Sequence, residues 1–140
     1  MPFALHRFDA GIRSANEVAA SLGLDPGAVY KTLVLQGDTP ADVVVLMAPA
    51  DRDVNLKHVA AALGRKRLQM MRQRDAERVT GMPAGAISAI LLRDRRYTIL
   101  IAEEALERDT VLVSAGQHGA DVELSVHDLL QVTGARAVPV

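Results

Sequence analysis

The sequence predicts an α+β fold, a single domain in which helices flank a mixed β-sheet. Its 140 residues are 49% hydrophobic and 24% charged, which suits one globular domain with a hydrophobic core. Runs of β-branched and aliphatic residues occur between helical segments but do not alternate with them strictly. This pattern favours a mixed sheet over a doubly wound parallel fold. No internal repeat or linker interrupts the chain, so residues 1–140 are expected to form one domain.

Residues 29–35, Val-Tyr-Lys-Thr-Leu-Val-Leu, form the strand around which the rest of the prediction is arranged. Both of its faces are mostly apolar, so we expect a central strand that is covered on both sides. Lys31 shares one face with three aliphatic residues, where a charged group is unexpected. Two interpretations stay open. The side chain either extends from the strand end into water, or lines a pocket and meets an anion or a polarised carbonyl there.

Helices are predicted where capping residues and glycine stops enclose apolar residues at helical spacing. One helix follows the cap Ser14 and stops at Gly23, one follows Asn55 through Leu63 and stops at Gly64, one spans 72–80 and stops at Gly81, and one follows Ser125 to about Val132 and stops at Gly134. Single helical turns are expected after Asp25-Pro26 and over 103–108.

Further strands are predicted from short apolar runs that turn residues separate. The runs 29–35 and 43–48 are joined by the turn 37–40, which predicts a hairpin. The runs 87–92 and 97–102 are expected to be strands joined by the charged turn 93–96. The remaining predicted strands span 3–8, 111–114, 121–124 and 135–138, and a short extended piece spans 65–68.

Composition and charge exclude several classes of function. There is no cysteine, which rules out disulfides, thiolate metal sites and a cysteine nucleophile, and fits a cytoplasmic protein. The formal net charge is −1, so any nucleic-acid contact must use a local patch. No apolar run approaches the roughly 18 residues of a membrane span, and the first residues lack the basic and apolar regions of a secretory signal. We therefore expect no membrane association.

The chain shows none of the motifs that hold a metal or an organic cofactor. Its four histidines, at 6, 58, 118 and 127, are not at ligand spacing. A G-x-S-x-G elbow, a dinucleotide fingerprint and a P-loop are all absent. We expect neither metal nor cofactor, and no covalent nucleophile.

Two glycine-containing loops at predicted strand ends are candidate binding loops, over 85–88 and 114–119. Glycines let a ligand approach the backbone, and successive N–H groups can form an anion nest. Ordinary turn formation is the alternative. The second loop contains G-x-x-G, the clamp of an RNA-binding KH module. That module places the loop between helices, whereas strands flank it here, so we discount the match.

The window 65–78 is strongly basic. It contains six positive and two negative residues, a local charge of +4 in a chain whose total is −1. A solvated helical face and a surface for a phosphate backbone are the two interpretations. If the second holds, the expected contacts with the phosphate backbone of a nucleic acid come from Arg65, Lys66, Arg72 and Arg74.

Taken in order, several short motifs resemble the YbaK family, also called the prolyl-tRNA-synthetase-associated domain. They run through nearly the whole chain, and their ordered set is more specific than any one of them. The motifs are Val29-Tyr30-Lys31-Thr32-Leu33-Val34, Asp75-Ala76-Glu77-Arg78-Val79-Thr80-Gly81, Gly85-Ala86-Ile87-Ser88, and Ser114-Ala115-Gly116 with Gly119 and Asp121.

The resemblance implies a mixed, curved sheet around a substrate pocket and a free-standing, trans-editing deacylase. Such an enzyme hydrolyses the ester of mischarged aminoacyl-tRNA that carries a small residue of the Cys, Ala or Ser type, with tRNA(Pro) as one carrier. The implied partners are tRNA and, as an open alternative, an aminoacyl-tRNA synthetase. Lys31 matches the family's functional lysine. The substrate-binding residues that we expect are Tyr30, Thr32, Met47, Gly85, Ser88, Ser114, Gly116 and Asp121.

Three hypotheses about function follow. The first is the deacylase. The second is a catalytically silent module that binds tRNA or an aminoacyl-adenosine, because the family has Ser-Pro where this chain has Ser88-Ala89. The third is a small-molecule binder unrelated to tRNA, which depends on the predicted pocket alone. Deacylation assays on mischarged tRNAs separate them.

Overall fold

The computed structural model describes residues 1–140 and contains four α-helices, eight strands and three 3₁₀ turns. The strands are β1 (Phe3–Arg7), β2 (Tyr30–Gln36), β3 (Val43–Pro49), β4 (Gln69–Met70), β5 (Thr98–Ala102), β6 (Thr110–Ser114), β7 (Ala120–Ser125) and β8 (Arg136–Val138). The helices are α1 (Ala15–Leu22), α2 (Leu56–Leu63), α3 (Gln73–Thr80) and α4 (Val126–Thr133), and the 3₁₀ turns are η1 (Pro26–Ala28), η2 (Ile90–Leu92) and η3 (Glu103–Glu107).

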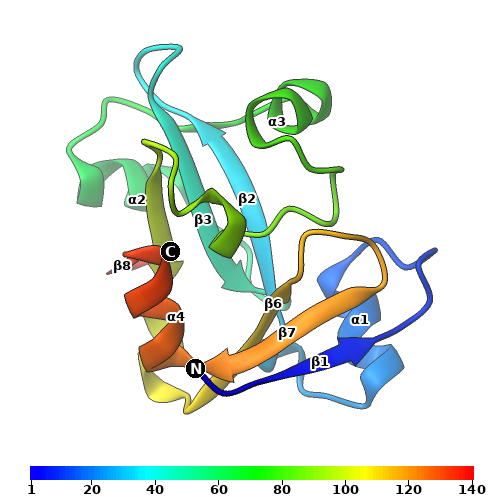
Figure 1. Ribbon diagram of the computed structural model, residues 1–140. Coiled ribbons are helices and arrows are strands. Elements are labelled where there is room, and N and C mark those ends of the chain that lie inside the picture. Colours follow the sequence, from blue (N-terminus) through cyan, green and yellow to red (C-terminus); the bar gives the residue numbers. More distant parts are fainter.

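The strands form two sheets that meet at one point. Five strands lie in the order β4-β2-β3-β5-β8, and three in the order β1-β7-β6. In the larger sheet, β2 and β3 are antiparallel, whereas β5 is parallel to both β3 and β8. A single parallel bridge between Val29 and Leu112 joins the two sheets, and β6 and β2 lie side by side there (Figure 1). The predicted α+β class with a mixed sheet is confirmed, as is the β2–β3 hairpin.

The central strand is β3 rather than β2. Every residue of β3 is buried, whereas in β2 only Tyr30, Val34 and Leu35 are. The prediction that 29–35 would be the central, doubly covered strand is therefore wrong. The outer edge of β2 pairs with the two-residue strand β4 at Leu35 and Gln36, and the carbonyl of Val34 accepts the N–H of Met71. No strand pairs with this edge between Val34 and the bridge at Val29.

All four predicted helices are present, and their ends follow the capping signals. The Ser14 hydroxyl accepts the N–H of Glu17 at the start of α1, and the Asn55 side chain accepts the N–H of Lys57 at the start of α2. Each helix is followed by a glycine with φ between 67° and 73°, the left-handed conformation that glycine adopts without strain. None of the helices has the length and hydropathy that crossing a membrane requires.

One predicted strand is absent, and another lies further along the chain. Residues 87–92 form a largely buried loop that ends in η2, with Leu91 exposed, so the hairpin expected across 93–96 does not exist; β5 instead lies parallel beside β3. Ile87, Ala89 and Leu92 are buried without alternating, because a short apolar run can fill the core as irregular chain as well as in a strand. The extended piece expected at 65–68 occurs at Gln69–Met70 instead, as β4.

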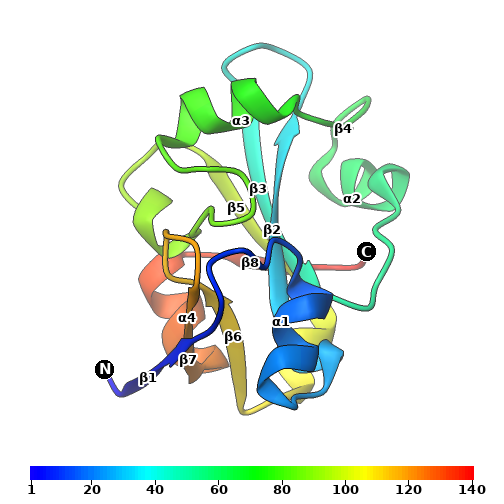
Figure 2. The same ribbon diagram turned by 90° about the vertical axis from the view of Figure 1, so that its right-hand side faces the viewer.

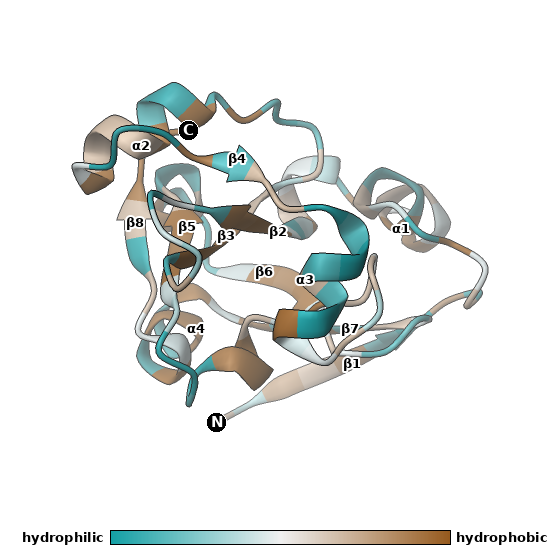
Figure 3. Ribbon diagram, turned by 90° about the horizontal axis from the view of Figure 1, so that it is seen from above, coloured by the Kyte–Doolittle hydropathy of each residue, from teal (hydrophilic) through white to brown (hydrophobic).

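Helices α1 and α3 lie towards opposite ends of β2 (Figure 2). Seen from above, α3 is coloured as hydrophilic over most of its length, whereas β3, to its left in this view, is coloured as hydrophobic (Figure 3). The two ends of β2 thus differ in character. Helix α3, which is mainly polar, lies towards one end, and apolar residues of α1 cluster with Val29, just before β2, at the other.

Candidate active site

A small cavity lies between α1, the first half of β2 and the loop that joins β6 to β7. Its volume is about 90 Å³, well below the roughly 300–1,000 Å³ of pockets for drug-sized ligands. It is lined by Phe8, Ile12, Arg13, Ser14, Ala15, Val18, Tyr30, Lys31, Thr32, Gly85, Ile87, Ser114, Gln117, Gly119 and Asp121. Segments from both ends of the chain and from its middle therefore form one site.

The open edge of β2 forms one wall of this cavity. The carbonyl of Val34 accepts the N–H of Met71 at 3.0 Å on the edge away from β3. Backbone groups along a strand point alternately to its two edges, so Thr32, two residues earlier, presents its N–H and C=O to that same edge. No strand pairs with Thr32 there, because β6 is bridged only at Val29 and β4 begins pairing at Leu35.

Lys31 is one of the residues that line the cavity, and its side chain has no carboxylate partner. Its ammonium donates to the backbone carbonyl of Arg52 at 2.8 Å, and none of the ion pairs in the structure includes it. The turn that carries this carbonyl is fixed by the Arg52 guanidinium, which lies 3.1 Å from the carboxylate of Glu104. The charge of Lys31 is thus held in place and remains unneutralised.

Two hydroxyl groups next to Lys31 in sequence are buried and have no hydrogen-bond partner, those of Tyr30 and Thr32. Burial, together with the negative charge of Glu104, raises the pKa of Tyr30 to about 12, so its hydroxyl is a neutral donor. Buried polar groups without a partner are uncommon and mark positions where a water or a ligand completes the hydrogen bonding.

Asp121 is the only residue with a carboxylate among those that line the cavity. The residue is 7% exposed. Burial raises the pKa of its carboxyl group to about 6, against the opposing effect of the positive charge of His6. On the sheet Asp121 lies opposite His6 on β1 and Ser114 on β6. The His6 ring, however, is bonded to Glu123 at 2.8 Å.

The glycine loops come close to the chain that leads into α1. Gly85 has φ 82°, and a Cβ there would lie 3.1 Å from the carbonyl oxygen of Arg13; Gly119 has φ 86°, and its Cβ would lie 3.0 Å from that of Phe8. Both glycines line the cavity. They allow the two loops to approach the backbone of residues 8–13 closely, which keeps the cavity small.

The cavity brings together six of the nine predicted active-site residues, namely Lys31, Tyr30, Thr32, Gly85, Ser114 and Asp121. The other three lie outside its lining. Met47 is 0% exposed in the core on β3; Ser88 is 1% exposed, and its N–H donates to the sulfur of Met82. Gly116 faces Leu91, whose Cδ1 would be 2.5 Å from an added Cβ.

Sequence reasoning missed the side of the cavity that α1 and the preceding turn provide. Ile12, Arg13 and Val18 line it, yet Val18 follows the ordinary spacing of a buried helix face, and Ile12 and Arg13 are in a turn. The capping box at Ser14 shows where this helix begins, but not what it packs against.

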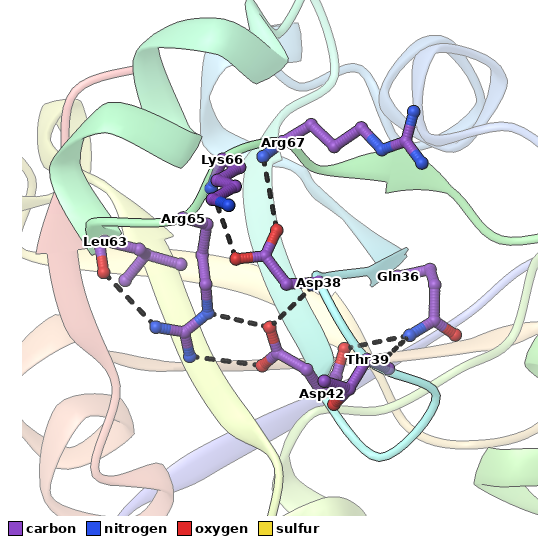
Figure 4. Close-up of polar contacts among 8 residues, drawn as sticks. All are labelled: Gln36, Asp38, Thr39, Asp42, Leu63, Arg65, Lys66 and Arg67. Atoms are coloured by element: carbon purple, nitrogen blue, oxygen red, sulfur yellow. Dashed lines mark hydrogen bonds and ion pairs between the residues drawn. The ribbon is translucent and has the colours of Figure 1, made fainter.

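The basic window divides into a structural part and an exposed part. Arg65 forms a two-point ion pair with Asp42, at 2.7 and 3.1 Å, and Asp38 accepts the N–H groups of Lys66 and Arg67 (Figure 4). The guanidinium of Arg65 is therefore occupied within the fold. Arg72 and the side chain of Lys66 are exposed.

Beside α3 lies a groove of about 430 Å³, lined in part by Arg72 and Arg78. Arg74 is exposed on the same helix. The exposed cations that sequence analysis assigned to the tRNA backbone, Lys66, Arg72 and Arg74, are thus present at the surface in the α3 region, and Arg65 alone is committed to an internal ion pair.

Comparison with known proteins identifies the family. The sequence profile of the aminoacyl-tRNA editing domain matches residues 9–132. The chain belongs to the aminoacyl-tRNA editing domain family. The YbaK-like resemblance is thereby confirmed, and the family's class of activity, hydrolysis of aminoacyl-tRNA, applies to this editing domain.

Two relatives of known name are similar to this chain in sequence. The chain is 35% identical over 123 residues to EbsC of Enterococcus faecalis, a protein named for Cys-tRNA(Pro)/Cys-tRNA(Cys) deacylase activity, covering 88% of this chain and 74% of that protein. It is 31% identical over 110 residues to the proline–tRNA ligase of Desulforamulus reducens, covering 79% of this chain but 19% of the ligase.

The solved structure is that of a protein described as a trans-editing enzyme for prolyl-tRNA synthetase. It superposes with a TM-score of 0.85 at 20% identity, over 98% of this chain and 85% of that chain. This likeness confirms the fold.

Proposed function

We propose that this editing domain removes a small amino acid, of the Cys, Ala or Ser type, from mischarged tRNA, with tRNA(Pro) as the first candidate carrier. The observation that carries the proposal is the cavity of about 90 Å³ with the unneutralised charge of Lys31 in its wall. EbsC, named for Cys-tRNA(Pro) and Cys-tRNA(Cys), supports the substrate class.

The chemistry needs few protein groups. An aminoacyl ester is already activated, so water or the free ribose hydroxyl can attack its carbonyl once positioned. The protein has to bind the 3′-terminal adenosine and stabilise the oxyanion that develops. The ammonium of Lys31 and the backbone N–H of Thr32 are two donors of the cavity-lining residues, and either can serve the carbonyl oxygen.

The size of the cavity determines which amino-acid side chains are accepted. A cavity this small admits the side chains of alanine, serine or cysteine and obstructs larger ones, which is how an editing site spares a bulkier cognate residue. Ile12, Val18 and Ile87 form the apolar part of the lining. They set the limit on side-chain size.

The tRNA body is proposed to contact the exposed cations near α3, Lys66, Arg72 and Arg74. Phosphate contacts position a nucleic acid without reading its sequence. Together with the groove beside α3, they would direct the acceptor end along β2 towards the cavity.

The test is a deacylation panel in which the purified protein alone is added to tRNAs charged with Ala, Ser, Cys, Thr or Pro. We expect at least one of the first three to be hydrolysed faster than the Thr and Pro esters, with EDTA present throughout. If no ester is cleaved above the rate in buffer, the protein is a silent binding module. If EDTA abolishes cleavage and zinc restores it, the metal-free chemistry proposed here is wrong.

A further inference from the structure

Asp121 is a buried carboxylate that forms no ion pair with the protein. The side chains of the nearby basic residues each have another hydrogen-bond partner. His6 is bonded to Glu123, Arg13 donates to the carbonyl of Ala10, and Lys31 donates to the carbonyl of Arg52. A buried charge without a partner is unfavourable, so its retention at the cavity requires a reason.

Two further oxygens accompany the carboxylate. Ser114 lies directly opposite Asp121 on β6, and directly opposite residues on neighbouring strands have side chains on one face and close together. The Ser114 hydroxyl accepts one N–H, from Gly116 at 3.2 Å, and keeps a second lone pair. The hydroxyl of Thr32 lacks a partner. One anionic and two neutral acceptors, from β7, β6 and β2, therefore line one small cavity.

We propose that Asp121 binds the α-ammonium group of the aminoacyl substrate, with the hydroxyls of Ser114 and Thr32 as its other acceptors. This inference rests on the proposed function. An ammonium has three N–H donors and no acceptor, which matches such a set of oxygens. The α-ammonium is the one cation that every aminoacyl ester carries. The substrate class thus narrows to esters with a free α-amino group, and N-acylated esters are excluded.

The assignment separates two tasks within the cavity. Asp121 on β7 holds the amino end of the substrate, while Lys31 and the open edge of β2 face the ester. An amino acid anchored by its ammonium presents its carbonyl in a fixed direction, which is the positioning that lowers the barrier of such a reaction.

The decisive test compares binding of two stable amide analogues, alanyl-3′-amino-3′-deoxyadenosine and its N-acetyl derivative. We expect the wild-type protein to bind the free amine at least 100-fold more tightly. Asp121→Asn should reduce this preference to less than about 3-fold by weakening the free amine alone. Glu123→Gln removes the same charge two residues along β7, outside the cavity, and should keep the wild-type preference.

Three results would overturn the assignment. The first is that the wild type binds both analogues equally, and the second is that it binds neither. The third is that Asp121→Asn weakens the binding of both analogues to the same extent, which would indicate a structural role. Because the amides are not hydrolysed, these results are independent of catalysis. A protein that prefers the free amine but cleaves no ester in the panel contradicts the proposed deacylation and not this inference.

The pH dependence gives a second readout. Burial raises the pKa of Asp121 to about 6, so the preference for the free amine should diminish as the pH falls through 6 and the carboxylate is protonated. The charged or titratable groups around Asp121 are His6, opposite it on β1, Glu123, two residues along β7, and Lys31 and Arg13, which line the same cavity. The variant His6→Asn should still lose its preference for the free amine at low pH. If the preference no longer depends on pH in this variant, His6 is the titrating group and the assignment is wrong.

Thermal unfolding tests whether Asp121→Asn leaves the fold intact. A carboxyl group whose pKa is higher in the folded state destabilises that state above the folded pKa. The variant should therefore melt at or above the wild-type temperature at pH 7.5, and this advantage should disappear below pH 4. A variant that melts well below the wild type at pH 7.5 would assign Asp121 to the fold instead.

Discussion

Lys31 combines an apolar setting with an unneutralised charge. Its stem lies on a mostly apolar strand, and its ammonium is held by a single backbone carbonyl, that of Arg52. A hydrogen bond to a neutral carbonyl fixes the position of the nitrogen without cancelling its charge. The residue is therefore oriented before substrate arrives, which is the condition for electrostatic stabilisation of an oxyanion.

Lys31→Ala should lower the deacylation rate by roughly 10²-fold, the scale of losing one transition-state donor. The melting temperature should change little, because the carbonyl of Arg52 can be hydrated once the ammonium is removed. Both quantities are measured on one preparation. Lys57→Ala, an exposed lysine on α2, is the matched control and should behave as the wild type. If the Lys31→Ala variant deacylates at the parental rate, Lys31 is not part of the active site.

At single positions, two of the predicted site residues line the cavity: Lys31, singled out as a charge on an apolar strand, and Asp121, implied by the family resemblance. Met47 and Ser88 lie outside its lining, because a buried apolar side chain and a buried hydroxyl give no sign in the sequence of which cavity they face. Whether Met47 lines a pocket depends on the position of β2 across it, and that is a property of the folded sheet.

The tip of the β2–β3 hairpin connects the larger sheet to the segment before α3. Gly37 is required there, because a Cβ would lie 1.8 Å from a carboxylate oxygen of Asp42. With that space free, Asp42 forms its two-point ion pair with Arg65, and Asp38 holds the backbone after it (Figure 4). The hairpin thus fixes the start of the basic segment.

Asp42→Asn should lower the free energy of unfolding by about 1–3 kcal/mol at pH 7, since hydrogen bonds to charged groups in partly buried positions are worth this much. Denaturant titration measures it, and Asp42→Asn with Arg65→Met in a double-mutant cycle isolates the pair. Asp75→Asn, which removes an exposed pair with Arg78 at 3.6 Å, is the control and should cost less than about 0.5 kcal/mol.

The effect of Asp42 also has a defined dependence on pH. The hydrogen bond from Arg65 lowers the pKa of Asp42 below its ordinary value of 3.8. A lowered folded pKa stabilises the protein above the ordinary value, and the benefit is lost as the pH falls through the folded pKa. The difference between wild type and Asp42→Asn should therefore shrink below about pH 4. A difference that stays constant down to pH 2 would show that the charge of Asp42 does not matter.

For whole elements, local signals predicted helices better than strands. Caps and glycine stops act within a few residues, and all four helices begin and end close to the predicted positions. Pairing partners are set by distant segments. Residues 87–92 have the composition of a strand, but β5 already occupies the edge of β3, so this run fills the core as a loop instead.

At the scale of the whole molecule, the charge is unevenly distributed. The net charge is −1, yet exposed cations gather around α3, at the end of β2 away from α1 (Figure 2). A polyanion is therefore attracted to one region rather than to the whole surface. That region is distinct from the cavity, so affinity for tRNA and hydrolysis of the ester should be separable by mutation.

Reversal of Arg72 and Arg74 to Glu together should weaken binding of all tRNAs alike. Each lost phosphate contact should reduce the salt dependence of binding by about one unit of slope. Deacylation of a short aminoacyl-adenosine substrate, which lacks the tRNA body, should be unchanged. Reversal of Lys57 and Arg93, two exposed cations elsewhere, is the matched control. An unchanged slope would identify the α3 cations as a solvated face.

The pairing of β1 with β7 has a consequence for how the protein is made. Residues 3–7 pair with residues 120–124, so the first strand must wait for more than 110 further residues to be synthesised. Long-range pairing of this kind forms late, since the intervening chain has to be ordered first. Phe8 and Asp121, which follow β1 and lie within β7, both line the cavity. A nascent chain emerging from the ribosome therefore acquires helices α1 to α3 and the β2–β3 hairpin well before it has a site in which an ester can be held.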